Sequence, residues 1–251
     1  MAKAILAAMG EHSVELGRIR ELMDLAFCSR ATNAPEDRVV FPLLVSCRDI
    51  TEEILFAIAN RHGRAALRAT RTMYECLVVA RYLNLHPEKT EDFLSMFHAE
   101  WARVCQDIPA AYRCAEMDSA IATHVPKYAQ GKRVGMNDLN WSGAQIHDMA
   151  REAGPLAELH SSAYTLSSAY IHPGAMFYLG TLSPSSQDGN IIKVSEGTQD
   201  REAKYALRTA HDLLLNAVDL RLKYEPALLL RNAFDSCSTD FVRIWGYKPH
   251  I

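Results

Sequence analysis

Apolar residues return at helical spacing along most of this chain, and that pattern limits its possible folds more than any other feature. The spacing predicts helices at about residues 2–29, 41–61, 64–85, 90–116, 143–154, 155–172 and 200–223, with one or two more after residue 226. Residues 182–199 form a polar interruption with room for one short β-hairpin. The sequence therefore predicts an all-α protein, an irregular multi-helix bundle of about seven to nine helices.

The number of domains follows from length and composition. The chain has 251 residues, of which 49% are hydrophobic, so it can bury a sizeable core. It contains no internal repeat, no low-complexity tract and no long linker. The loop near residue 185 is the best candidate for a domain boundary, but we do not expect it to be one. We expect a single helical domain over residues 1–251, with a core at 40–222 and a C-terminal helical extension at 226–251.

Charge and hydropathy limit the partners and the location of the chain. The formal net charge is -3, which gives no global attraction to nucleic acid or to an anionic membrane, so any polyanion must bind to a local cluster. No apolar run approaches the roughly 18 residues of a membrane span. The six cysteines form no C-x-x-C pair, and the first ten residues are too short and too weakly apolar for a signal peptide. These features predict a cytoplasmic protein with reduced thiols and no membrane partner.

Several common catalytic motifs are absent. The sequence holds no G-x-G-x-x-G, no Walker loop, no G-x-S-x-G and no H-E-x-x-H. No glutamate is followed by a histidine three residues later, as in helical di-iron proteins, and Glu158 and His160 fall on different faces of a helix. We therefore predict no cofactor and no metal site of local spacing.

A cationic stripe marks the helix predicted at 64–85. On a period of about 100° per residue, its members fall within an arc of roughly 80°, if the helix continues back through Gly63. They are Arg61, Arg64, Arg68, Arg71 and Glu75. Arginine presents a planar fork that matches phosphate or carboxylate, so the stripe suits a polyanion. The alternative is a solvated helix face on which Arg71 and Glu75 form a weak i,i+4 pair.

The helix predicted to end at His172 carries a second pattern. Small hydroxyls and an imidazole fall within an arc of roughly 60°, at Ser161, Thr165, Ser168 and His172, with Tyr164 and Tyr170 on either side. Such a stripe is suited to line a cavity with His172 as an acid, a base or a ligand. The alternative is a histidine that stabilises a helix C-terminus through the helix dipole.

Three short segments, taken together, resemble a prokaryotic all-helical domain family of unknown function. They are Arg71-Thr72-Met73-Tyr74-Glu75, Asn140-Trp141-Ser142-Gly143 and Ser168-Ala169-Tyr170-Ile171-His172-Pro173. They match an Arg-x-x-x-Glu helix, a Trp-Ser-Gly turn and a Ser-x-Tyr-x-His-Pro helix end, in the same order, over roughly residues 40 to 220. The resemblance implies that Arg71, Glu75, Trp141 and His172 lie around one site. It implies no activity.

The helical layout is more distantly similar to the higher eukaryotes and prokaryotes nucleotide-binding (HEPN) domains. Many of these are metal-independent ribonucleases of toxin or phage-defence systems with an Arg-x4-6-His motif. Arg81 and His86 fit that spacing, but about two such matches arise by chance in a chain of this composition. Upstream of His172, Leu166 and Ser167 stand where the arginine of the motif belongs.

Three functions remain open from the sequence. In the first, the protein acts on RNA or another phosphate-bearing ligand such as a nucleotide. Its catalytic residues are His172, Glu75 and Arg71, and its ligand-binding residues are Arg64, Arg68, Trp141, Ser168 and Tyr170. In the second, the same polar residues fix helix packing in a non-catalytic interaction module. In the third, scattered His and Glu residues bind a metal for small-molecule chemistry.

The last predicted partner is a second copy of the chain. The C-terminal segment is apolar and includes Phe234, Phe241 and Trp245. Since two-fold dimers are the commonest assembly, we expect this segment to pack on a second subunit.

Overall fold

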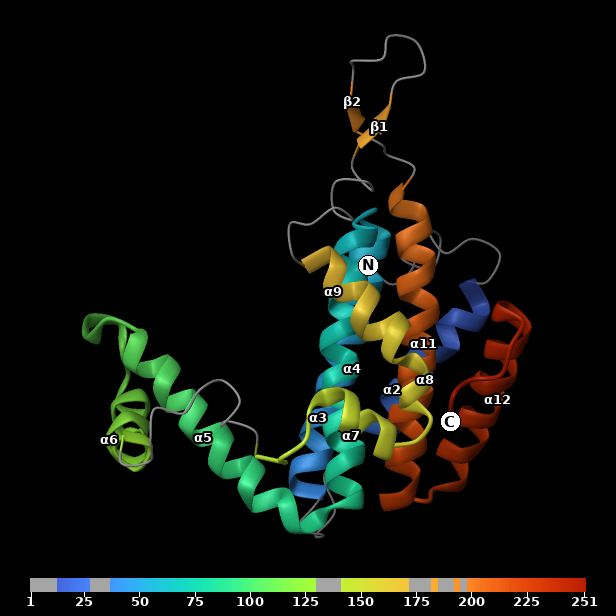
Figure 1. Ribbon diagram of the computed structural model, residues 1–251. Coiled ribbons are helices and arrows are strands. Elements are labelled where there is room, and N and C mark those ends of the chain that lie inside the picture. Colours follow the sequence, from blue (N-terminus) through green and yellow to red (C-terminus); the bar gives the residue numbers. More distant parts are fainter. Residues whose placement is uncertain (1–12, 28–36, 130–140, 172–181, 185–191, 195–197) are drawn as a thin grey trace.

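The computed structural model describes residues 13–27, 37–129, 141–171, 182–184, 192–194 and 198–251, and most of them are helical (Figure 1). The predicted all-α bundle is confirmed. No helix in these ranges is long and apolar enough to cross a membrane. The predicted first helix is described only over α2 (Ser13–Phe27), and His172 lies outside the described residues.

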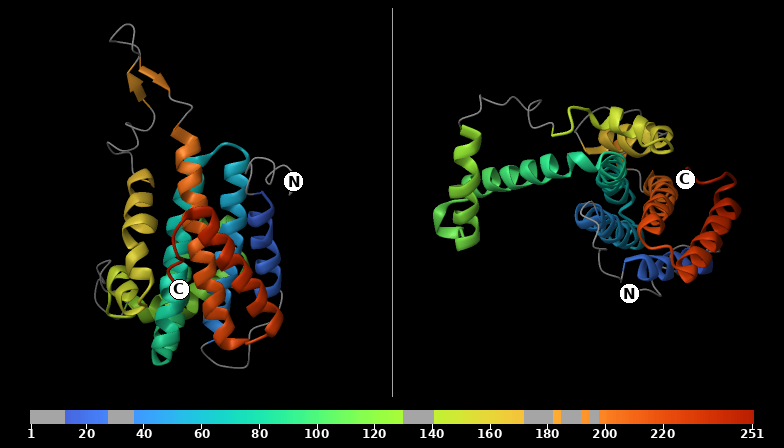
Figure 2. Two further views of the ribbon diagram at one scale, coloured as in Figure 1. Left: turned by 90° about the vertical axis from the view of Figure 1, so that its right-hand side faces the viewer. Right: turned by 90° about the horizontal axis from the view of Figure 1, so that it is seen from below.

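Three long helices form the centre of the bundle. They are α3 (Asp37–Ala59), α4 (Gly63–Leu85) and α11 (Thr198–Tyr224), and each packs against the other two. Helix α2 and α12 (Leu228–Trp245) pack on each other and on α11, at the side of the bundle away from α7 and α9 (Figure 2). Because α4 lies between several neighbours, its apolar residues are buried over most of its circumference rather than along one stripe.

A charged residue lies inside this core. The Arg221 side chain of α11 is 0% exposed, as is the Asp37 carboxylate 3.5 Å away at the start of α3. The guanidinium also pairs with Glu225 one turn later, and its carbon lies 4.6 Å from the centre of the Phe41 ring. These contacts join the C-terminal part of α11 to the beginning of α3.

Two predicted helix boundaries are wrong, for local reasons. Arg61 has a φ of 61°, in the left-handed region, so the helical conformation is interrupted between α3 and α4. Arg61 therefore does not extend the arginine stripe of α4. Helix α3 begins at Asp37 rather than near residue 41, so Pro42 lies inside the helix and not in its first turn.

An arm of two helices projects from the bundle (Figures 1 and 2). After the short turn η2 (Pro87–Lys89), α5 (Thr90–Asp107) leads away from α4, and α6 (Ala115–Ala129) packs back on α5. Pro109 ends α5 instead of kinking it, and η3 (Ala110–Tyr112) follows. The range predicted as a single helix, 90–116, thus contains α5, the turn η3 and the first residues of α6, because proline stops a helix at or before the preceding residue.

A layer of short helices covers one side of α4. It consists of α7 (Ile146–Glu152), α8 (Leu156–Leu159), η4 (His160–Thr165) and α9 (Leu166–Ile171). The helix predicted from residue 155 to 172 is present up to Ile171, but its middle turn, η4, is a π-helix with i→i+5 hydrogen bonds. Such turns are rare and are frequently found at functional sites.

The polar interruption contains the predicted hairpin. Strand β1 (Leu182–Pro184) pairs antiparallel with β2 (Ile192–Val194), with Leu182 opposite Val194. The pair lies beyond one end of the bundle, next to the start of α11 (Figure 1).

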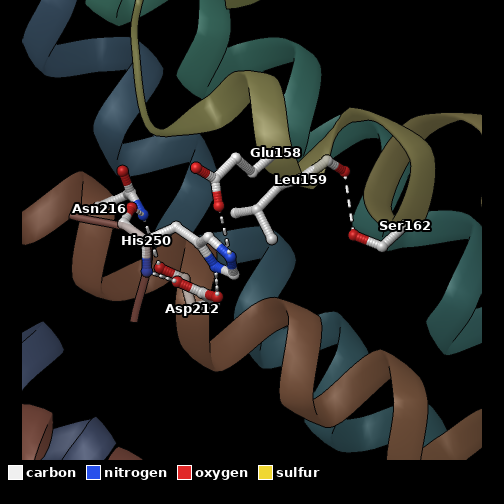
Figure 3. Close-up of polar contacts among 6 residues, drawn as sticks. All are labelled: Glu158, Leu159, Ser162, Asp212, Asn216 and His250. Atoms are coloured by element: carbon white, nitrogen blue, oxygen red, sulfur yellow. Dashed lines mark hydrogen bonds and ion pairs between the residues drawn. The ribbon is translucent and has the colours of Figure 1, made fainter. Parts of the chain in front are cut away.

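The C-terminal tail contacts the bundle through hydrogen bonds and an ion pair of His250 (Figure 3). Nδ1 of His250 lies 2.6 Å from Asp212 Oδ2, and the backbone N–H of His250 donates to Asp212 Oδ1 at 2.9 Å. The side-chain amide of Asn216 donates to the backbone carbonyl of His250. Nε2 of His250 lies 3.4 Å from Oε2 of Glu158 in α8. The tail therefore bridges α11 and the layer that covers α4.

The aromatic residues that the sequence placed at a dimer interface make contacts inside this chain. Phe234 is 4% exposed and Phe241 is fully buried, both in the core cluster. Trp245 donates from Nε1 to Nδ1 of His211 at 3.2 Å. These three residues therefore give no support to the expected dimer.

Candidate functional site

The first two arginines of α4, Arg64 and Arg68, contact two different neighbouring helices. Arg64 Nε lies 3.4 Å from Glu202 Oε2 of α11, and Arg68 Nε donates to the carbonyl of Tyr170 in α9 at 2.9 Å. Both arginines thus help to hold neighbouring helices against α4. Arg68 is nevertheless exposed.

Arg71 contacts the π-helical turn. Its Nε donates to Glu75 Oε1 at 2.9 Å, its Nη2 donates to the Tyr164 hydroxyl at 3.2 Å, and its guanidinium carbon lies 4.5 Å from the centre of the Tyr164 ring. Burial lowers the pKa of Arg71, but the hydrogen bonds and charges of Glu75 and Tyr164 more than offset this and raise it. The Arg71 side chain is still 23% exposed, so a held cation remains open to an anion.

The geometry fixes which nitrogen of His160 carries the proton. The hydroxyl of Tyr74 donates to the carbonyl of Leu156 at 3.1 Å, and the same oxygen lies 3.2 Å from His160 Nδ1. Because a hydroxyl has one hydrogen, Nδ1 must be the donor in the second contact. Nε2 of neutral His160 therefore carries the free lone pair. Burial raises the pKa of Tyr74, which keeps this hydroxyl protonated.

The surroundings of His160 keep it neutral. Its ring stacks on Tyr164, with centroids 4.9 Å apart and planes at 19°, and meets the edge of the His147 ring at 4.9 Å. Burial and then the nearby His147 lower the pKa of His160. A neutral imidazole with a free Nε2 is suited to act as a general base near pH 7.

His147 presents the opposite kind of group. Arg151 Nη2 lies 3.2 Å and Asp148 Oδ1 lies 3.6 Å from its Nδ1. When Nδ1 accepts from Arg151, the ring proton is on Nε2, and in the imidazolium both nitrogens carry hydrogen. Nε2 of His147 is therefore a donor in either state, and this side chain is 53% exposed.

We call these side chains the His160 cluster. It comprises Arg71, Glu75, His147, His160 and Tyr164, supported from beneath by the buried Tyr74. It joins a base, a donor and a cation on the surface between α4, α7 and the π-helical turn. Two predicted site residues, Arg71 and Glu75, belong to it.

Trp141 lies elsewhere. Its ring packs on Tyr82 at 5.7 Å and on Phe93 at 5.1 Å, where α5 leaves the bundle. Tyr82 follows Arg71 by 11 residues (82 − 71), which is about 16 Å along α4. Trp141 is therefore part of an aromatic junction beneath the arm and not a neighbour of Arg71.

The hydroxyl stripe also differs from expectation. Ser161 and Thr165 are exposed, and Ser168 donates to the Tyr164 carbonyl at 2.6 Å. The buried hydroxyl of this segment is instead Ser167, 2.8 Å from Thr70 of α4. The stripe therefore faces outward over part of its length.

Tyr170 and the Arg81–His86 pair have structural partners. Tyr170 is buried, and its pKa is raised by burial and then by the nearby Glu202. Arg81 is almost buried and donates to the Asn216 carbonyl at 2.9 Å and to Asp219 at 3.0 Å, both in α11. His86 Nε2 lies 2.8 Å from Glu152 of α7. The pair with HEPN-like spacing therefore serves helix packing.

His160, His147 and Tyr74 were missed as site residues by the sequence reasoning. Tyr74 lies inside the Arg71–Glu75 segment, and Tyr164 follows His160 by one helical turn, so a weak signal existed. What joins them is a contact between residues 86 positions apart, which no local spacing reveals.

Comparison with known proteins places the chain in a family but gives no activity. A family model described as "Family of unknown function (DUF5677)" matches residues 37–190. This range contains the whole His160 cluster. No curated protein and no solved structure matches the chain.

Proposed function

The chain belongs to the DUF5677 family of unknown function, and we propose that it cleaves RNA without a metal ion at the His160 cluster. One observation carries the proposal: the Tyr74 hydroxyl holds Nδ1–H of His160 and leaves Nε2 without a hydrogen, and the partly exposed Arg71 contacts Tyr164, the ring on which His160 stacks. A base of fixed tautomer next to a cation is what phosphodiester transesterification requires.

Each group has a role in the proposed reaction. His160 Nε2 takes the proton of a ribose 2′-hydroxyl, and the 2′-oxygen then bonds to the adjacent phosphorus while the bond to the 5′-oxygen breaks. The leaving oxygen takes a proton from Nε2 of His147 in its imidazolium form. Arg71, held by Glu75, stabilises the charge on the non-bridging oxygens, and the exposed Arg68 one turn away attracts the strand. The products are a 2′,3′-cyclic phosphate and a free 5′-hydroxyl.

The substitution His160→Asn tests the base directly. The asparagine amide can still donate to the Tyr74 oxygen, but it is not basic enough to take up a proton near pH 7. We expect the cleavage rate of a fluorescent single-stranded RNA in EDTA to fall at least about 100-fold. Because the pKa of His160 is lowered, wild-type cleavage should persist somewhat below pH 6.5 and disappear as the pH falls through that lowered value.

Two further variants sharpen the test. His98→Asn changes an exposed histidine that stacks on His124 in the arm, and it should leave the rate unchanged. His172→Ala tests the catalytic residue expected from the sequence, so a loss in this variant and not in His160→Asn would move the base to residue 172. RNA that stays intact with the wild-type protein would overturn the proposal.

The second candidate is a non-catalytic interaction module. It is favoured by the contacts of Arg64 and Arg68 with α11 and α9 and by the buried pair Thr70–Ser167, all of which hold helices together. Intact RNA, combined with a lower melting temperature for His160→Ala, would support this function. For the metal-dependent alternative, no three His, Cys, Asp or Glu side chains gather into a possible metal site within the described ranges.

A further inference from the structure

A pocket lies between the first half of α11 and the end of α12, and none of its lining residues belongs to the His160 cluster. It has a volume of about 270 Å³ and is lined by Arg201, Lys204, Tyr205, Arg208, Ile244 and Trp245. Lys204 and Tyr205 of α11 are adjacent and each lies three or four residues from both Arg201 and Arg208, so the four residues share one face of that helix. Ile244 and Trp245 close the pocket from α12.

The charge of this pocket is positive. Arg201, Lys204 and Arg208 line it, and no carboxylate does. Within the part of the chain that the structure describes, none of the three forms an ion pair; the neighbouring Glu202 is buried and lies against Arg64. The Asp212 carboxylate lies near enough for Arg208 to act on its pKa, but it is bonded to His250 and does not line the pocket. Three cations that face a shared space lined by no carboxylate favour an anionic ligand.

Arg208 is held in a useful orientation. Its guanidinium carbon lies 4.7 Å from the centre of the Tyr205 ring and 5.6 Å from that of Tyr247. A guanidinium packed on aromatic rings keeps its N–H groups in a fixed plane, and two of them can bind two oxygens of one phosphate.

The opposite wall supplies a flat apolar surface. Trp245 is fixed by the hydrogen bond from its Nε1 to His211 Nδ1, and its ring is partly exposed on the pocket side. Burial lowers the pKa of His211 to about 3, so this histidine adds no charge. An indole face beside a phosphate-binding cation is suited to stack a planar ring.

We propose that this pocket binds a small phosphate ester that carries a planar ring, of the size of a nucleoside monophosphate. The volume is near the lower end for ligand pockets, about 300 Å³, which fits one ring and one phosphate better than a larger ligand. The phosphate contacts Arg208 and Arg201 while the ring stacks on Trp245. The site shares no residue with the His160 cluster and does not depend on its function.

Calorimetric titration of the full chain with AMP, adenosine and inorganic phosphate tests the proposal. We expect AMP to bind at least about tenfold more tightly than either fragment, because only AMP uses both walls. Arg208→Gln should weaken AMP at least about tenfold, and Trp245→Phe should weaken AMP while leaving inorganic phosphate unchanged. Circular dichroism would check that each variant is folded.

A matched pair of lysines separates the pocket from general charge effects. Lys204→Gln and Lys223→Gln remove the same charge from exposed positions of α11, but only Lys204 lines the pocket. Only the first should weaken AMP. A 5′-phosphorylated RNA trinucleotide that displaces AMP would identify strand ends as the source of the ligand, and failure to displace it would identify free nucleotides.

Three results would overturn the proposal: no AMP binding, equal affinity for AMP and inorganic phosphate, or Arg208→Gln with unchanged affinity. His160→Asn should bind AMP as the wild type does, so the two proposed sites can fail separately.

Discussion

Replacing Arg221 with methionine should lower the free energy of unfolding by about 3–5 kcal/mol. Arg221 and Asp37 are both 0% exposed, so the substitution leaves the buried Asp37 carboxylate without this counter-charge. A loss of that size is large against the roughly 5–15 kcal/mol of a typical domain. Urea unfolding, followed by circular dichroism at 222 nm, would measure it.

The control for this prediction removes both charges. In Arg221→Met with Asp37→Leu, neither charge of this pair is left buried without the other, and much of the lost stability should return. Lys223→Gln, an exposed change two residues away, should alter stability by less than about 0.5 kcal/mol. An Arg221→Met protein within about 1 kcal/mol of wild type would show that this pair does not hold α11 to α3.

Acidification from pH 7 to pH 4.5 should destabilise the protein by about 2–3 kcal/mol through His211 alone. Burial lowers the pKa of His211 from 6.5 to about 3, so the folded protein keeps the ring neutral where the unfolded chain protonates it. The stability that this preference supplies is fully present above pH 6.5 and is lost as the pH falls from 6.5 toward 3. The hydrogen bond that Nδ1 accepts from Trp245 requires the same neutral ring.

His211→Asn isolates this effect. Its amide oxygen can accept the Trp245 N–H, but the side chain does not titrate. The difference in unfolding free energy between wild type and variant should therefore change by about 2–3 kcal/mol between the two pH values, whatever the other groups contribute. A difference that stays constant with pH would mean that His211 is not kept neutral by folding.

Helical periodicity predicted the fold class well because the spacing of apolar residues shows which positions are buried, and most buried residues of this chain lie on helices. Helices α4, α7 and α11 lie close to their predicted ranges. The errors came where one residue sets the backbone. Arg61 takes a left-handed conformation and Pro109 stops a helix, and neither event changes the spacing of the apolar residues.

The π-helical turn was missed for a related reason. The buried positions in and on either side of this turn, at Leu159, Ala163 and Ser167, keep intervals of four that an ordinary helix also allows. The hydrogen bonding within the turn differs, but the sequence pattern does not.

The candidate site was predicted only where its contacts are local. Arg71 and Glu75 are one turn apart, so their pairing could be inferred from spacing. The role of His160 depends on Tyr74 in another helix, and the position of Trp141 depends on Phe93 in the arm. Such contacts depend on how helices are arranged in space, which one sequence does not specify locally.

The projecting arm implies that the protein unfolds in separate local steps, with the arm before the bundle. Of the residues of α5, only Thr90, Ala99, Ala102 and Cys105 are buried, whereas α4 is buried over most of its length. Amide hydrogens of α5 and α6 should therefore exchange with solvent through a local opening of low free energy, well before those of α4 and α11. Trp101 lies in the arm, Trp141 at its junction and Trp245 in the bundle, so proteins that keep one tryptophan each would report three separate steps of unfolding by fluorescence.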